Sequence, residues 1–474
     1  MQTRNIGEIT GGGGPVPRVV VGGTHSGVGK TTVATALMVA FTRRGLRVQA
    51  FKVGPDFIDP GFHEAATGRP SHNLDGWMLS RAANEDIYAR AAEGADLVIV
   101  EGVMGLFDGY SGTQEAGSTA EMAKWLDAPV VLVVDAAAMA RSGAAMVHGY
   151  ATFDPGLTLG GVIFNRVNGA GHYRYLREAV EVRAEAEALG FLSDDAAIRL
   201  PERHLGLELA RTAATPRYLD ALVAWVNATV DLERVLRLAA SAGSTGRRRV
   251  APDARVATQA RIGVARDSAF CFYYEENLSW LRRHGAELVT FSPLGDASLP
   301  QNLDGLYLGG GYPELFAERL SANDGMRASV REFAAGGGPV YAECGGLMYL
   351  TDAIVDSAGR SFSMAGVFPT CARMQARVTL GYTEVEITTD WLWLRGGERL
   401  RGHQFRYSSI DAMPACVGRA YCLVGNTRKE SEGYTSGAVL GSYVHLHFGA
   451  CPDFARRFVA TCAAHAQKRL NPTL

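Results

Sequence analysis

A glycine-rich segment near the start of the chain has the residue types that hold phosphate groups. The strand-like Val19–Val21 runs into GGTHSGVGKTT, residues 22–32. Glycines let backbone N–H groups turn toward an anion, and a helix that starts here adds its positive dipole end. In such a loop Lys30 would reach the β- and γ-phosphates, and the Thr31 hydroxyl would hold Mg²⁺. The predicted ATP-binding residues are Gly27, Gly29, Lys30, Thr31 and Thr32.

The spacing of this loop departs from the strict GxxxxGKT pattern. That pattern places a glycine at position 24, where this chain has Thr24, and Gly23 comes one residue early. Lys30 is also the only lysine in this loop. Partition-type ATPases share a second lysine near the start of the same loop. We therefore interpret the segment as a variant phosphate loop and disfavour the partition class.

Acidic residues follow two further strand-like segments. Glu101 and Asp108 come just after Leu97–Val100, and Asp56 and Asp59 lie in a proline-containing loop after another strand. Ligands of parallel sheets bind at the carboxyl ends of the strands. Asp108 is expected to meet substrate or to order its own loop. Carboxylate oxygen suits Mg²⁺, and the predicted metal ligands are Thr31, Asp56 and Glu101.

A second set of reactive residue types lies in the C-terminal half. Residues 337–348 read GGPVYAECGGLM, in which a strand, Cys344, two glycines and a helix follow one another. This order resembles a nucleophile elbow, because glycines permit the sharp turn and a helix N-terminus favours thiolate. His445 ends the last predicted strand and is the candidate base. The backbone N–H groups expected to bind an oxyanion belong to Gly310, Gly311 and Gly345.

Alternating strands and helices must position both sets of residues. This alternation indicates an α/β fold with mostly parallel sheets covered on both faces. The strands predicted in the first half are Arg18–Val21, Arg47–Phe51, Ala95–Val100, Val130–Val134 and Thr158–Phe164, with helices at Thr31–Arg44 and Tyr173–Leu189. The strands predicted in the second half are Arg261–Arg266, Ala286–Phe291, Gly305–Leu308 and Pro339–Ala342.

The length of 474 residues is too great for one ordinary core and indicates two or three domains. A stretch rich in Ala, Ser, Gly and Arg marks a linker at residues 239–260. The prediction is a flexible glycine-rich tail at 1–17, a P-loop domain at 18–238, the linker, and a thiol-bearing α/β domain at 261–474.

Charge and cysteine content exclude several classes of protein. Lys and Arg number 47 against 49 Asp and Glu, a net charge of −2, so no overall field attracts nucleic acid or an anionic membrane. No apolar run approaches the ~20 residues of a membrane span. The seven cysteines form no CxxC pair, and no export signal is evident. A cytoplasmic protein without nucleic-acid or membrane partners is predicted.

These segments together resemble the cobyrinic acid a,c-diamide synthase family. Its members join a dethiobiotin-synthetase-like P-loop domain to a class I glutamine amidotransferase domain. The resemblance extends from about Val19 to Phe448 and rests on GTHSGVGKTT, FKVGPDFIDPGFH, NLDGWML, VEGVMGLFDG, LPERHLGL, LGGGYPE, YAECGGLMYL and SYVHLHF. It implies two doubly wound domains, the second of them flavodoxin-like.

The resemblance implies ATP- and glutamine-dependent amidation of the a and c acetate carboxylates of cobyrinic acid in cobalamin biosynthesis. ATP, a co-substrate used with Mg²⁺, would convert each carboxylate to an acyl phosphate, and Cys344 with His445 would release ammonia from glutamine. The implied partners are small molecules only: a corrinoid, ATP and glutamine. Whether the chain forms a homodimer stays open. The substrate residues implied by matched motifs are Asp56, Asp59, Asp108, Arg203 and His204.

The chain departs from class I amidotransferases at the third member of the triad. Their glutamate lies two residues after the histidine, where this chain has His447. The resemblance therefore implies that another group orients His445, and that glutamine is hydrolysed slowly until substrate binds.

The same motifs are compatible with several related functions. Amidation of hydrogenobyrinic acid or of a nickel-sirohydrochlorin would use the same motifs. Cobyric acid synthase fits less well, because the loop after its second strand does not resemble GPDFIDP, and dethiobiotin synthesis alone would leave the second half unexplained. A P-loop regulatory ATPase with a relic amidotransferase domain is disfavoured by the intact Cys344 and His445 pair.

Overall fold

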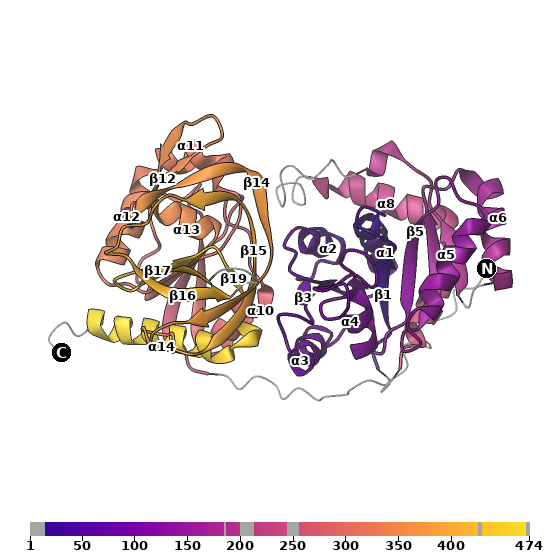
Figure 1. Cartoon of the computed structure of the whole chain (residues 1–474), viewed down its shortest axis with the longest axis horizontal. Coiled ribbons are helices and arrows are strands. Elements are labelled where there is room, and N and C mark those ends of the chain that lie inside the picture. Colours follow the sequence, from indigo (N-terminus) through magenta and orange to yellow (C-terminus); the bar gives the residue numbers. More distant parts are fainter. Residues whose placement is uncertain (1–14, 184–185, 200–212, 244–255, 425–428, 471–474) are drawn as a thin grey trace. The chain divides into compact units, whose positions relative to one another are not determined.

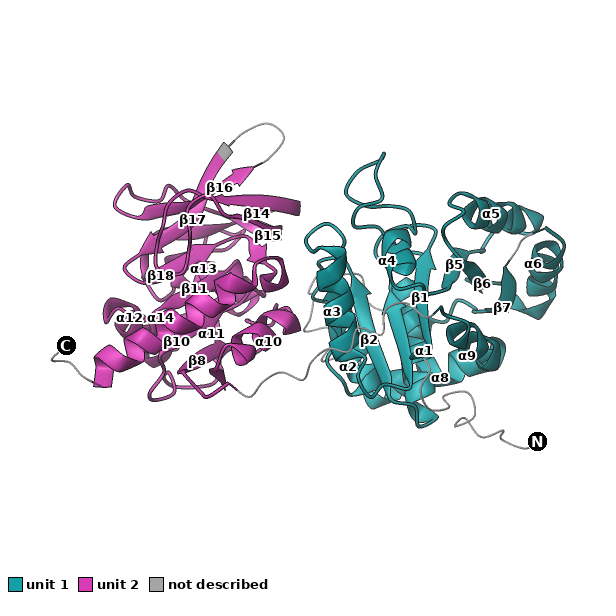
Figure 2. Cartoon of the chain, turned by 90° about the horizontal axis from the view of Figure 1, so that it is seen from below, with its two compact units in different colours: residues 1–251 teal, residues 252–474 magenta. Residues whose placement is uncertain are grey.

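The computed structural model describes residues 15–183, 186–199, 213–243, 256–424 and 429–470. The chain divides into two compact units, residues 1–251 and 252–474 (Figure 2). The predicted tail at 1–17 and linker at 239–260 lie largely outside the described residues. None of the described helices is long and apolar enough to cross a membrane.

The first unit is built on a parallel sheet whose described strands lie in the order β3-β2-β4-β1-β5-β6-β7. Every described pair of neighbours in this sheet is parallel, as predicted for the α/β fold. The strands are β1 (Arg18–Gly23), β2 (Val48–Val53), β3 (His72–Leu74), β4 (Leu97–Glu101), β5 (Val130–Asp135), β6 (Leu159–Asn165) and β7 (Glu187–Phe191).

Helices cover both faces of this sheet because its strands carry apolar side chains on both. Val19 and Val21 of β1 pack into a core with α1, α8 and α9. On the opposite face, the glycine at position 143 of α5 lies against Phe164 of β6; Figure 1 shows β5 between α1 and α5. The helices are α1 (Lys30–Arg43), α2 (Asp59–Thr67), α3 (Arg81–Ala91), α4 (Thr119–Trp125), α5 (Arg141–Thr152), α6 (Gly169–Arg183), α8 (Pro216–Thr229) and α9 (Leu232–Ala240), with a short 3-10 turn, η2 (Ala196–Ile198).

One predicted helix of this unit is wrong at its C-terminal end. The helical spacing extended to Leu189, but α6 ends at Arg183 and Glu187–Phe191 forms strand β7. Strand β7 pairs with β6 at the edge of the sheet. Pairing with a neighbouring strand therefore overrides the helical propensity of a run rich in Glu and Ala.

The second unit combines a parallel sheet with an antiparallel extension. Strands β9-β8-β10-β11-β18 are parallel neighbours, whereas β14 to β17 pair antiparallel beside them. The parallel strands are β8 (Ala260–Ala265), β9 (Ala286–Phe291), β10 (Gly305–Leu308), β11 (Val340–Glu343) and β18 (Val439–Ser442). The others are β12 (Thr351–Val355), β13 (Ser361–Ser363), β14 (Phe368–Ile387), β15 (Arg399–Ile410), β16 (Gly418–Val424), β17 (Lys429–Ser436) and β19 (His445–Leu446).

The parallel strands of this unit were predicted closely, and the antiparallel strands were missed. Strand β14 has a largely part-exposed surface, and antiparallel strands of this kind lack the continuous apolar run of a buried parallel strand. The described helices and 3-10 turns are α10 (Glu275–Arg283), η3 (Pro313–Phe316), α11 (Ala317–Ala322), α12 (Asp324–Ala335), α13 (Gly345–Leu350), η4 (Phe448–Ala450) and α14 (Pro452–Leu470).

Candidate active sites in the two units

The predicted phosphate loop joins β1 to α1, and its glycines are sterically required. Gly27 and Gly29 have φ angles of 83° and 101°, which favour glycine. A Cβ at Gly29 would lie 2.4 Å from Nδ2 of Asn165. That amide donates to the Val28 carbonyl oxygen at 2.9 Å. The Asn165 side chain, at the carboxyl end of β6, therefore packs directly against the phosphate loop.

The unusual spacing of the loop also has a steric explanation. Thr24 has no positive φ, so position 24 does not need a glycine, and its backbone N–H donates to the Val133 carbonyl oxygen of β5 at 3.3 Å. A Cβ at Gly23, in contrast, would lie 2.8 Å from Cγ of Lys30. The same Cβ would lie still closer to the Val28 side chain, 2.6 Å from its Cγ1, so position 23 requires a glycine because both side chains pack against it.

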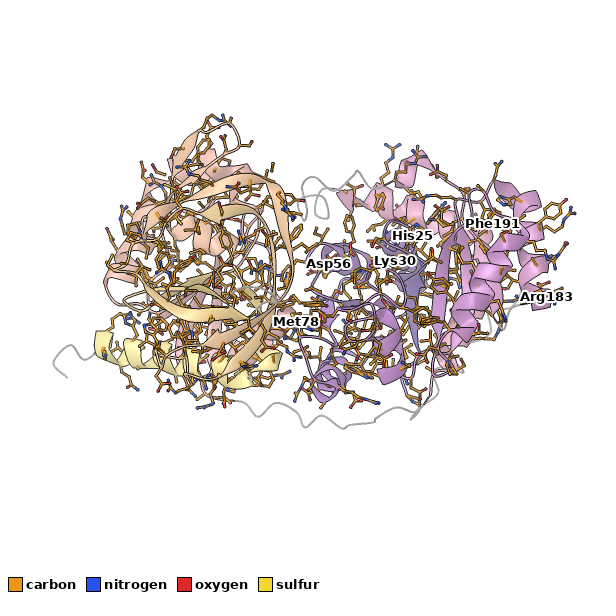
Figure 3. The ribbon with its side chains drawn as sticks, in the orientation of Figure 1. His25, Lys30, Asp56, Met78, Arg183 and Phe191 are labelled. Atoms are coloured by element: carbon orange, nitrogen blue, oxygen red, sulfur yellow. The ribbon has the colours of Figure 1, made fainter. Side chains whose placement is uncertain are left out.

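A cleft of about 830 Å³ opens over this loop at the carboxyl ends of the strands. It brings together the predicted ATP-binding residues and three of the four acidic residues. Its lining includes Gly27, Gly29, Lys30, Thr31, Thr32, Asp56, Asp59 and Glu101, and also Lys52, Asn165, Arg166, Asp194 and Trp225. Figure 3 labels Lys30 and Asp56 among them.

A buried ionic network forms the floor of this cleft. The Lys52 ammonium lies 2.8 Å from an Asp59 oxygen and 2.9 Å from a Glu101 oxygen. Glu101 also accepts from the Thr31 hydroxyl at 2.7 Å and lies 2.6 Å from Nε2 of His63. Burial opposes the charge of Glu101, but Lys52 and His63 outweigh it and hold the pKa of this carboxyl well below its usual range. Burial likewise opposes the charge of Lys52, yet the two carboxylates raise its pKa.

Lys52 is a site residue that the sequence analysis missed. It lies within the buried strand β2, and only 3% of its side chain is exposed. A lysine in a buried strand needs a charged partner, because an unpaired buried charge is strongly unfavourable. The lysine within the strand-like start of FKVGPD was the signal available in the sequence.

The residues predicted to hold Mg²⁺ are compatible with a hard cation. Thr31 and Glu101 are in contact at the cleft floor, and Asp56 lines the same cleft. Hydroxyl and carboxylate oxygens are the donors that such a cation prefers. No group of three or more His, Cys, Asp or Glu side chains within the described residues could bind a metal.

The other predicted substrate residues are placed differently. Asp108 accepts the backbone N–H of Gly105 at 2.9 Å and does not line the cleft in the described structure. Of the two predicted roles, this contact corresponds to the ordering of its own loop. Arg203 and His204 lie outside the described residues.

Replacement of Lys52 by methionine is expected to destabilise the first unit by about 3–5 kcal/mol, because it leaves Asp59 and Glu101 buried without their cation. Chemical denaturation would measure the change. The double variant Lys52→Met with Glu101→Gln should recover part of the loss, since one of the uncompensated charges is also removed. Equal stability of the single variant and the natural chain would contradict the ionic network.

In the second unit, Cys344 occupies a sharp turn between β11 and α13. Its φ and ψ are 48° and −101°, an uncommon conformation for a residue with a side chain. The Cys344 N–H donates to the Ser442 carbonyl oxygen at 2.7 Å, and Sγ lies 3.7 Å from the Phe405 carbonyl oxygen. The elbow predicted from the glycines is therefore present.

Close backbone packing brings the predicted oxyanion glycines to this turn. A Cβ at Gly345 would lie 3.1 Å from the Gly311 nitrogen. A Cβ at Gly310 would lie 2.3 Å from Cε1 of His445. Gly345 and Gly311 thus lie at the Cys344 turn and Gly310 lies against His445, although the strand geometry differs from the prediction. Strand β18 ends at 442, and His445 starts a separate short strand, β19.

The thiol and the imidazole are both uncharged in this arrangement. Burial raises the pKa of Cys344 to about 12, and the nearby Glu314 carboxylate adds to the shift despite Arg406 and the Gly345 N–H. Burial lowers the pKa of His445 to about 3. The short helix α13 does not produce the thiolate expected from a helix N-terminus. The proton must therefore leave Cys344 as the thiol reacts.

Alkylation of Cys344 by iodoacetamide is expected to be slow at pH 7, because only about one thiol in 100,000 is ionised when the pKa is near 12. The rate should rise about tenfold per pH unit up to that pKa. Peptide mass spectrometry would follow it, with the exposed Cys416 as the internal reference. Labelling of Cys344 at pH 7 as fast as Cys416 would contradict this assignment.

Strand β15 forms a wall of the thiol site that the sequence analysis did not identify. The Phe405 carbonyl contacts Cys344, and His403 pairs in register with His445 of β19. The two histidine rings are stacked, with centroids 4.9 Å apart and planes 18° apart. In the sequence, the histidine within the segment RGHQFRYS was the available sign that this strand contributes to the site.

His447, at the position of the usual glutamate, has another structural role. Its Nδ1 accepts the Gly449 N–H at 3.1 Å and caps the short turn η4. Its ring packs on Tyr274 with centroids 4.6 Å apart.

Comparison with known protein families matches both units. Residues 19–207 match the CobQ/CobB/MinD/ParA nucleotide binding domain. Residues 261–452 match the CobB/CobQ-like glutamine amidotransferase domain.

Several curated proteins are similar over nearly their whole length. Cobyrinate a,c-diamide synthase of Syntrophotalea carbinolica is 46% identical over 452 residues, which cover 94% of this chain and 98% of that protein. The protein of the same name from Priestia megaterium is 42% identical, with 95% and 98% coverage. Hydrogenobyrinate a,c-diamide synthase of Streptomyces coelicolor is 41% identical, also with 95% and 98% coverage. With a nucleotide cleft in one unit and a cysteine elbow in the other, this chain belongs to the cobyrinate a,c-diamide synthase family, ligases of the glutamine amidotransferase type.

Proposed function

We propose that this chain converts the a and c acetate carboxylates of cobyrinic acid to amides, with ATP and glutamine as co-substrates. The observation that carries the proposal is the presence, in one chain, of a P-loop cleft and of a buried cysteine elbow with its histidine. The first can activate a carboxylate and the second can supply ammonia. We assign the synthetase reaction to residues 18–238 and the glutaminase reaction to residues 261–474.

Cys344 is the proposed nucleophile of the glutaminase reaction. Its proton passes to His445 as Sγ attacks the side-chain amide carbon of glutamine, and N–H groups of Gly310, Gly311 or Gly345 stabilise the oxyanion. The C–N bond then breaks, the nitrogen takes the proton from His445, and ammonia leaves. Water hydrolyses the resulting thioester to glutamate and regenerates the thiol.

The P-loop cleft is the proposed synthetase site. A substrate carboxylate oxygen attacks the γ-phosphorus of ATP, ADP leaves, and an acyl phosphate forms. Lys30 neutralises charge on the phosphates, and Lys52 keeps the cleft floor from repelling them. Ammonia then attacks the acyl carbon, and inorganic phosphate leaves as the amide forms. Thr31, Asp56 and Glu101 would hold Mg²⁺, which neutralises phosphate charge when bound.

The substrate residues are proposed on the same basis. Asp56 and Asp59 line the cleft in which the carboxylate would be activated, and Asp108 orders the loop beside it. Arg203 and His204, from the matched motif, would meet the acidic rim of the macrocycle.

The metal-free corrinoid is a second candidate substrate. The family includes proteins named for cobyrinate and a protein named for hydrogenobyrinate, at 46% and 41% identity to this chain. Other relatives named for cobyrinate are 40% identical, so identity does not separate the two substrates. Cobyrinic acid is the first candidate, and hydrogenobyrinic acid is the alternative.

The proposal is tested by mass spectrometry of cobyrinic acid, and separately of hydrogenobyrinic acid, after incubation with the full chain, Mg-ATP and glutamine. Two successive mass changes, each equal to replacement of OH by NH₂, are expected with cobyrinic acid. Conversion of hydrogenobyrinic acid alone would favour the second candidate. No change in either corrinoid, with ATP still hydrolysed, would refute the proposed substrate.

A further inference from the structure

His403 stacks on the proposed catalytic histidine, a contact that the chemistry above does not use. Strands β15 and β19 place His403 directly opposite His445. The ring centroids are 4.9 Å apart with an angle of 18° between the planes. Both side chains are buried, with 1% and 0% of the residue exposed. A face of the His445 ring is therefore covered by a second imidazole.

The backbone sets the separation of the two strands that carry these rings. A Cβ at Gly402 would lie 2.2 Å from the His445 carbonyl oxygen, so a larger residue there would force the strands apart. On another side of the ring, a Cβ at Gly310 would lie 2.3 Å from Cε1 of His445. The imidazole of His445 is thus confined between Gly310 and His403.

His403 is itself held in place. Its Nδ1 lies 2.9 Å from the hydroxyl of Tyr274, a residue that precedes α10 and is also buried. Burial, together with His445 and His447, lowers the pKa of His403 well below its usual value. The stacked ring is therefore neutral and adds no positive charge beside His445.

We propose that His403 is a positioning residue for His445: its neutral, stacked ring holds the imidazole in the orientation that takes the proton of the Cys344 thiol. This inference rests on the proposed glutaminase reaction. It gives His403 and Tyr274 the orienting task that a glutamate performs in class I amidotransferases, at a position where this chain has His447.

The test compares His403→Ala and His403→Phe in the full chain, with glutamine or ammonium chloride as the nitrogen source. His403→Ala is expected to lower kcat with glutamine about tenfold or more, because a general base loses its orientation. The KM for glutamine should stay within about twofold, and amidation from ammonium chloride should be unchanged. His403→Phe keeps a stacked ring and should recover most of the lost kcat.

Leu400→Ala is the matched control, since Leu400 is buried on the same strand but packs in the core near α14. It should keep the natural kcat with glutamine. Tyr274→Phe removes only the hydroxyl that holds His403 and should lower kcat by a few-fold; it also serves if His403→Ala does not fold. An unchanged kcat in His403→Ala, an equal loss in Leu400→Ala, or no recovery with phenylalanine would each overturn the role of His403.

The assay also separates failure of this inference from failure of the proposed function. If the natural chain amidates neither corrinoid, the proposed substrate is wrong. Glutamate release from glutamine by the same variants then reports on His403 alone, with the same expected order. Natural glutamate release in His403→Ala would overturn the inference whatever the acceptor.

Discussion

Replacement of Cys344 by alanine is expected to abolish glutamine-driven amidation and to leave amidation from ammonium salts unchanged. The thiol is the group proposed to bond to glutamine, and removal of such a nucleophile costs at least about a thousandfold in kcat. Alanine should tolerate the φ of 48° as well as cysteine does, because both carry one Cβ, so the elbow should still fold. Steady-state rates of corrinoid amidation with each nitrogen source measure the effect.

Cys422→Ala is the matched control for this prediction. Cys422 is a partly buried cysteine of the same unit, on β16, away from the elbow. It should keep both activities. Loss of ammonium-driven amidation in a folded Cys344→Ala variant would contradict the proposal that one unit releases ammonia and the other forms the amide.

Replacement of Lys30 by alanine or methionine is expected to remove amidation from either nitrogen source, by about a hundredfold or more. The Lys30 ammonium donates to the His25 carbonyl oxygen at 3.1 Å and also to that of Met104, and it lines the cleft where the phosphates would bind. Without it, charge that develops on the transferred phosphoryl group is not neutralised. Rates with ammonium chloride measure this step alone.

The two Lys30 variants distinguish charge from packing. Methionine keeps a long side chain next to Gly23, so an equal loss in Lys30→Met and Lys30→Ala would assign the effect to the ammonium group. Lys124→Ala is the control, because Lys124 of α4 pairs with Asp154, which follows α5 in the same unit, and it should be dispensable for amidation. Ammonium-driven synthesis at the natural rate in either Lys30 variant would refute the role of the P-loop.

Local spacing was sufficient to predict the parts of each site that come from one continuous segment. The phosphate loop is a strand, glycines and a helix start within residues 22–32, and the elbow at Cys344 has the same form. Turns of this kind depend on short-range sterics, since glycine alone adopts some of the required φ angles freely. Most of the second unit's parallel strands could be predicted for a similar reason, because they are short, buried, apolar runs, whereas β9 is partly exposed.

Contacts between distant segments could not be read in this way. Lys52 meets Glu101 because β2 and β4 are neighbours in register, and His403 meets His445 because β15 returns beside β19. Both pairings depend on which strands lie side by side, and many registers are compatible with one sequence pattern.

The sequence by itself determined the two chemistries of this protein, a phosphate loop and a cysteine elbow, and the α/β class of the units that carry them. The tertiary structure alone decided the surroundings of the reactive groups. It placed the cation Lys52 at the carboxylates of the cleft, kept the thiol of Cys344 protonated through burial, and covered His445 with a second imidazole. The physical reason is that turn geometry is a short-range property, whereas burial, charge pairing and ring stacking arise only when strands far apart in the chain pack together.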